Sequence, residues 1–275
     1  MDYSKNGKKG AKKFWIKFYS DENFRKYIIE KWKQPKKDPI KSHNAAKIAA
    51  AARWKDHKKE NTKNVKTEKY PKDTRENIAL KYRLCAYLTG DGSLIIRTEK
   101  SRPKAVHSDI RFYPDDENML RSFLEAFTYL YKKEPKIYRE EKFMRVQKSS
   151  KMICNDLLRF TKFGAMEWKI PEIKTNKRAK IEWLRAFFDC EAYVSKRAIT
   201  IQSVNESGIK EIQKLLFYFS IKSKIYSYER KNKNWNKNYI LNIAPKQERM
   251  KFLNKIGFNH SRKQAKLKMY LADVA

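Results

Sequence analysis

The stretch "CAYLTGDGSL" (residues 85–94) runs from an apolar segment straight into an aspartate, Asp91, held between two glycines. The preceding residues, from Arg75, have the pattern of a helix, and the alternating stretch that follows has the pattern of a strand. A second stretch of the same kind, "LRAFFDCEA" (184–192), places Glu191 at the equivalent point, 100 residues later. A repeat of that length is too long for a solenoid, so the pattern predicts two related half-domains.

The elements around the two stretches follow one order. In the first half we expect a helix, strands over 93–99 and 105–113, a helix over 114–132, two short strands and a closing helix. From Lys177 the same order recurs, with strands expected over 193–197 and 198–204. The fold class is therefore α+β, with two pseudo-symmetric αββαββα half-domains at residues 75–168 and 169–275.

Residues 1–74 are predicted to form a basic, mainly helical extension. Ser20 or Asp21 is placed to cap a first helix, and a second helix is expected over 43–59, where alanine is abundant. A solvated extension and a small helical DNA-binding module both fit this composition.

The charge of the chain points to a polyanionic partner. The formal net charge is +34, with 23 Lys and Arg against 10 acidic residues in positions 1–80 and 42 against 21 in the remainder. Because both parts are basic, a basic tail on a neutral domain is excluded, and nucleic acid is the expected partner. No apolar run reaches the ~20 residues that span a bilayer, so a membrane partner is not expected.

The cysteines and the chain ends bear on location. Cys85, Cys154 and Cys190 are far apart with no CxxC pairing, and the basic N-terminus leads into no signal-peptide core. We expect an intracellular protein, cytoplasmic or organellar, that is not secreted. The chain begins with Met1 and ends "YLADVA", without the terminal residues of an intein, so a free-standing protein is expected.

The two helix ends, "LCAYLTGDG" (84–92) and "LRAFFDCEA" (184–192), resemble the signature of the LAGLIDADG homing endonucleases. The resemblance covers roughly residues 77 to 260, including the order of elements. It implies that the two signature helices pack through small residues, Ala86 with Gly90 and Ala186 with Cys190. Asp91 and Glu191 would then lie side by side at the pseudo-twofold axis. Cys190 stands where the signature has Ala or Gly, and Ala192 where it has its last glycine.

The same resemblance implies a site that hydrolyses phosphodiesters with Mg²⁺ or Mn²⁺. Asp91 and Glu191 would bind the metal, with Gly90 and Cys190 beside them, since hard oxygen ligands suit Mg²⁺. Lys148 and Lys246, just before the last helix of each half, would lie near the scissile phosphates and offset transition-state charge. Gln202 would help to order the water network.

Strand alternation predicts a face that reads DNA, because a β-ribbon fits the major groove. The residues expected on it lie on the first two strands of each half and on the fourth strand of the first half: Ser93, Ile95, Arg97, Glu99, His107, Asp109, Arg111, Arg145, Ser195, Arg197, Thr200 and Gln202. Two such faces would form a saddle on a duplex.

Three functions fit the sequence. The leading hypothesis is a monomeric, Mg²⁺-dependent, site-specific double-strand DNA endonuclease of the intron-homing type, and the intact Asp91 and Glu191 favour it. The alternatives are an RNA-splicing maturase that binds intron RNA, which the basic extension favours, and a non-catalytic DNA-binding regulator.

Overall fold

The computed structural model describes residues 20–33, 70–99, 102–141, 143–172, 176–229 and 236–272. The chain divides into two units, Met1–Thr67 and Glu68–Ala275. In the first unit, helix α2 (Glu22–Lys33) is capped by Asp21, whose carboxylate accepts a hydrogen bond from the backbone N of Phe24 at 2.9 Å. The helix expected over 43–59 lies outside the described residues.

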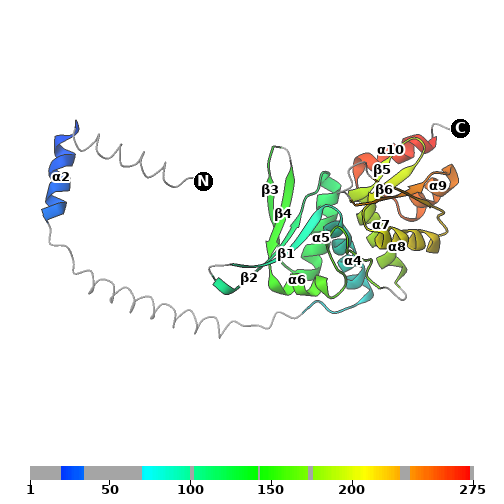
Figure 1. Cartoon of the computed structure of the whole chain (residues 1–275), viewed down its shortest axis with the longest axis horizontal. Helices are drawn as coiled ribbons and strands as arrows, with labels where there is room; N and C mark the ends of the chain where they lie inside the picture. Colours follow the sequence, from blue (N-terminus) through cyan, green and yellow to red (C-terminus); the bar gives the residue numbers. More distant parts are fainter. Residues whose placement is uncertain are drawn as a thin grey trace. The chain divides into compact units, whose positions relative to one another are not determined.

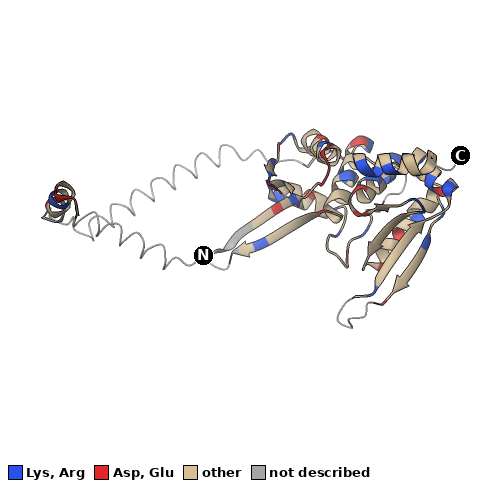
Figure 2. Ribbon diagram, turned by 90° about the horizontal axis from the view of Figure 1, so that it is seen from above, with Lys and Arg blue, Asp and Glu red and all other residues tan. Residues whose placement is uncertain are grey.

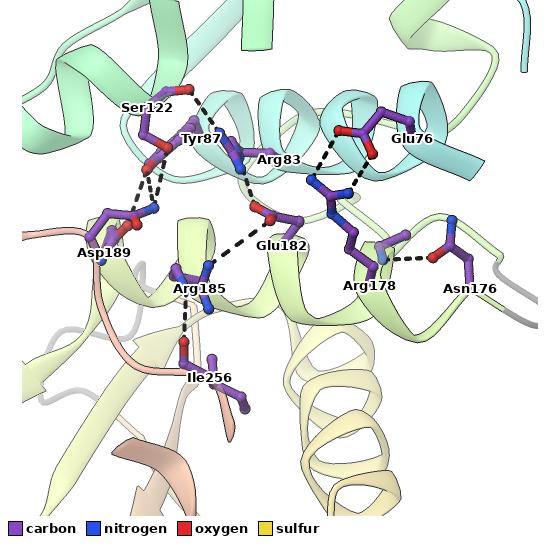
Figure 3. Close-up of polar contacts among 12 residues, drawn as sticks. Glu76, Arg83, Tyr87, Ser122, Asn176, Arg178, Glu182, Arg185, Asp189 and Ile256 are labelled. Carbon is purple, nitrogen blue, oxygen red and sulfur yellow. Dashed lines mark hydrogen bonds and ion pairs between the residues drawn. The ribbon is translucent and has the colours of Figure 1, made fainter. Parts of the chain in front are cut away.

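The second unit is built on two long helices, α4 (Arg75–Thr89) and α7 (Lys177–Glu191), which pack against each other (Figure 1). Polar contacts join them in the same order along both: Arg178 with Glu76, Arg83 with Glu182 at 2.7 Å, and Tyr87 with Asp189 at 3.1 Å (Figure 3). Because the contacting residues follow the same N-to-C order in both helices, the helices run parallel, and their C-terminal ends meet.

A four-stranded antiparallel sheet follows each of these helices. In the first half the strands are β1 (Gly92–Glu99), β2 (Arg102–Phe112), β3 (Lys136–Arg139) and β4 (Met144–Ser149), in the order β1-β2-β4-β3. In the second half they are β5 (Tyr193–Val194), β6 (Ile199–Ser203), β7 (Lys224–Tyr228) and β8 (Asn238–Ile243), in the order β5-β6-β8-β7. The identical strand order confirms the two pseudo-symmetric halves.

Helices connect and cover the strands. They are α5 (Glu117–Tyr131) and α6 (Lys151–Leu158) in the first half, and α8 (Glu206–Tyr218) and α9 (Lys246–Lys255) in the second. Helical spacing places the apolar residues Met119, Phe123, Phe127 and Tyr131 on one face of α5, and all four are buried. Phe123 stacks on Phe112 of β2, with ring centroids 4.6 Å apart, which fastens this helix to its sheet.

Two features differ from the sequence prediction. The strand expected over 193–197 is only two residues long, because Ser195 turns the chain: its hydroxyl accepts hydrogen bonds from the backbone N of Arg197 and of Ala198. An additional helix, α10 (Ser261–Ala272), follows the second αββαββα unit and buries Leu267 and Leu271. Its apolar residues recur at helical spacing, which is the signal that the prediction overlooked.

Candidate active site

The ends of α4 and α7 lie in direct contact. A Cβ added to Gly90 would fall 2.4 Å from Cys190 Cβ and 3.6 Å from the Glu191 Oε1 atom. The missing side chain at Gly90 therefore lets the two backbones approach until the following residues, Asp91 and Glu191, share one site. On the other side, Ala192 is buried at the end of α7 with φ −80° and ψ 132°, an extended conformation that alanine adopts without strain.

The two carboxyl groups of the site influence each other. Burial and the negative charge of Asp91 raise the pKa of Glu191 to about 7. Burial also raises the pKa of Asp91, while a hydrogen bond with Cys190 and the positive charge of Lys263 act to lower it. Glu191 is exposed at the surface, yet protein atoms desolvate its carboxyl group, so the pair is costly to ionise fully without a cation.

Residues beyond the two signature helices complete the site. Buried His260 lies 3.4 Å from both Asp115 and Asp116, at the start of α5. Lys263 of α10 donates hydrogen bonds to the carbonyl oxygens of Asp189 and, at 2.9 Å, of Cys190. The sequence prediction missed both residues: Lys263 lies on α10, which was not expected, and His260 directly precedes that helix.

The donor set of this site fits Mg²⁺. Within the part of the chain that the structure describes, no three or more His, Cys, Asp or Glu side chains gather as a metal site. Two carboxylates at a solvent-facing helix junction are nonetheless the arrangement that suits Mg²⁺, which keeps several waters and takes further oxygens from a phosphate substrate. Asp91 and Glu191 are the side chains that would hold it.

One face of the first sheet is polar, as strand alternation predicts. In the register of β1 with β2, Ser93 lies opposite Arg111, Ile95 opposite Asp109 and Arg97 opposite His107. Arg145, Gln147, Tyr138 and Lys136 continue this face across β4 and β3. The register shifts after Thr98, so the alternation that placed Glu99 on this face no longer applies there, and its side chain is outside the described part.

Asp109 has a structural partner on this face. It is 6% exposed, accepts a hydrogen bond from Ser149 Oγ and lies 3.7 Å from Arg111 Nη2. The carboxylate therefore forms an ion pair with the guanidinium of Arg111 within the sheet. Direct contact of Asp109 with DNA stays a prediction.

The corresponding face of the second sheet carries Thr200 and Gln202 of β6, opposite Asn242 and Ile240 of β8. Ser195 and Arg197 lie in the β5–β6 turn instead of on a strand, which corrects the placement made from sequence. The face also carries three exposed tyrosines, Tyr193, Tyr226 and Tyr228. The sequence prediction missed them, although Tyr226 and Tyr228 follow Lys224 at the spacing of two that is typical of one strand face.

The two candidate lysines occupy different surroundings. Lys148 lies opposite the buried Ile110, on the helix-covered face of the first sheet, and donates to the Glu134 carbonyl at 3.0 Å. This face is not the one that carries Arg111 and Gln147. Lys246 is the first residue of α9. The catalytic roles of Lys148, Lys246 and Gln202 stay predictions.

The geometry defines a pseudo-symmetric two-motif protein in which an acidic residue lies at the end of each paired helix: Glu191 is the last residue of α7, and Asp91 follows α4 by two residues. Residues 178–257 match the family model described as LAGLIDADG-like domain. The fold is similar to that of I-DmoI, called a homing endonuclease, whose structure in complex with DNA and Ca has a TM-score of 0.55 and 16% identity over 70% of this chain and 98% of that one. Residues 178–257 thus carry a LAGLIDADG-like domain, and the first half of the unit repeats the strand order of this domain.

Two curated relatives from Methanocaldococcus jannaschii match over much of the chain. A DNA polymerase is 30% identical over 209 residues, which are 71% of this chain and 12% of that protein. A replication factor C small subunit is 27% identical over 194 residues, 68% of this chain and 10% of that protein. The chain thus spans about a tenth of these relatives. In the described residues, no helix combines the length and apolarity needed to cross a membrane.

We expect the metal-free protein to lose thermal stability as the pH rises from about 4.5 to about 7. The pKa of Glu191 in the folded protein, about 7, lies above its ordinary value of 4.5, so the native state retains a proton that the unfolded chain releases. The pKa of buried Asp189 is raised to about 7 as well and acts in the same direction.

Melting temperatures measured between pH 4.5 and 8 in a chelator test this expectation. Glu191→Gln should flatten the decline, with Asp189 leaving a residual slope, whereas Glu125→Gln, an exposed change on α5, should keep the wild-type profile. An equally steep decline in the Glu191→Gln protein would contradict the coupling of the two carboxyl groups.

Proposed function

We propose that this protein is a site-specific endonuclease that cuts both strands of a DNA duplex with a divalent cation. The observation that supports this most is the meeting of Asp91 and Glu191 at the ends of two parallel helices, where the charge of Asp91 raises the cost of ionising Glu191. A repulsive carboxylate pair exposed at a surface has an evident use as a cation site. The pseudo-symmetry around it supplies one half-site for each strand.

The residues of the chain have distinct parts in this proposal. Asp91 and Glu191 hold the cation and orient the water molecules between them and the scissile phosphates. Bound Mg²⁺ supplies activation of a water and stabilisation of the leaving oxygen. Gly90 sets the distance between the two carboxylates, since any side chain there would push the helix ends apart.

The polar sheet faces would provide the DNA contacts. Arg97, Arg111 and Arg145 lie on one face of the first sheet, where guanidinium groups can pair with guanine in the major groove. Lys and Arg are spread over both halves (Figure 2). The solved structures of I-DmoI with its target DNA and with Mn, Mg or Ca support the same partner and cofactor class for this chain.

Both half-sites are on one polypeptide, so a monomer is sufficient for the reaction we propose. The test is to incubate the full chain with a library of randomised duplexes and Mg²⁺, and to sequence the cut ends. We expect cuts on both strands at one related family of sequences, and none in the presence of a chelator.

Other outcomes would favour the other functions. Sequence-specific binding of DNA without any metal-dependent cut would point to a DNA-binding regulator. Tight binding of a structured intron RNA, with no cut of any duplex, would point to a maturase.

A further inference from the structure

Lys263 makes an unusual contact at the end of α7. Its ammonium group donates hydrogen bonds to the carbonyl oxygens of Asp189 and Cys190, in the last turn of the helix. Carbonyls in the last turn lack helical partners and carry partial negative charge, which a cation satisfies. In the first half, no described helix lies between α6 and α7, so the end of α4 has no counterpart of α10.

The fold holds Lys263 in this position through contacts with both halves. The carboxylate of Asp189, buried in α7, accepts hydrogen bonds from the backbone N of Asn259 at 2.8 Å and of His260 at 3.0 Å. Asp116 of the first half accepts hydrogen bonds from Ser261, from its backbone N at 3.2 Å and from its hydroxyl. These contacts fix the start of α10, and Lys263 follows directly.

The charge of Lys263 also acts on the carboxyl groups of Asp91 and Glu191. It opposes the rise in pKa of both Asp91 and Glu191. The Cys190 carbonyl precedes Glu191 directly, and a carbonyl already bound to an ammonium group has less electron density to offer another cation. A positive charge near the site also repels a divalent cation.

We propose that Lys263 is a positioning residue whose ammonium group takes the place of a metal cation at the C-terminal end of α7. Its ammonium group holds the α7 carbonyls and offsets the Asp91–Glu191 charge while the site is empty, and it weakens the binding of a divalent cation there. The two halves of the site therefore differ, although their folds match. This inference rests on the proposed cation site but not on DNA cleavage.

Calcium binding to the full-length protein, measured by calorimetry without DNA, tests the proposal. Lys263→Met removes a positive charge that lies at hydrogen-bond distance from the Cys190 carbonyl. We therefore expect the variant to bind Ca²⁺ about tenfold more tightly than the wild type does. The melting temperature of this variant should be lower than that of the wild type in chelator and should recover more on adding Ca²⁺. Lys268→Met removes the same charge elsewhere on α10 and should behave as the wild type.

A second variant keeps the test valid if Lys263→Met folds poorly. Lys263→Gln can still donate to the carbonyls but carries no charge, so it too should bind Ca²⁺ more tightly. Equal Ca²⁺ affinity in the wild type and both variants would overturn the proposal and leave Lys263 as a helix cap. If the variants bind Ca²⁺ more tightly but the wild type cuts no DNA, the proposed nuclease function fails while the role of Lys263 stands.

Discussion

We expect the Asp91→Asn protein to bind its DNA target at least as tightly as the wild type and to cut neither strand. The change keeps the shape of the side chain but removes half of the negative charge that would hold the cation. Losing the cation's stabilisation of the transition state costs several kcal/mol, which corresponds to a rate reduced by about a thousandfold or more. DNA affinity should not fall, because a negative charge facing phosphates is removed.

Strand-resolved cleavage of a supercoiled plasmid that carries the target measures this effect. Glu191→Gln should reduce cleavage in the same way, since both carboxylates belong to one site. Glu125→Gln, which removes an exposed charge on α5, serves as the control and should cut at the wild-type rate. Cleavage by the Asp91→Asn protein at the wild-type rate would exclude the role assigned to this carboxylate.

The second large effect is expected at Gly90. In Gly90→Ala the new methyl carbon would fall 2.4 Å from Cys190 Cβ. Both carbon atoms are fixed to their backbones, so the helices themselves must move apart. We expect a loss of about 3 kcal/mol in the free energy of unfolding, or about 6 to 12 °C in melting temperature. The separated carboxylates should also lose cleavage activity.

A second substitution at Cys190, made in the Gly90→Ala protein, separates this steric cause from other effects. Cys190→Gly removes the opposing Cβ and should restore most of the stability of Gly90→Ala, less about 1 kcal/mol for a glycine within a helix. Cys190→Ala keeps that Cβ and should restore little. Equal recovery with both changes, measured by thermal unfolding, would show that the helix ends do not meet as described.

Much of the fold could be predicted from local pattern. The period of two in β1 and β2 correctly separated Arg97, His107 and Arg111 from the buried Ile110 and Phe112. Helical spacing placed α4, α5 and α7 within three residues at each end, because each buries one apolar face against its own sheet or partner helix. The repeat of an acidic residue after two apolar helices identified Asp91 and Glu191.

Long-range contacts decided the remainder. The turn at Ser195 and the docking of the start of α10 onto α7 depend on hydrogen bonds that strand and helix patterns do not encode. The same holds for Lys263, which is one lysine among many until Asp189 and Asp116 fasten the start of α10 to both halves. The sequence thus determined two matching halves and their two carboxylates. Only the tertiary structure decided that one helix end is capped by an ammonium group, because that contact joins residues some seventy positions apart.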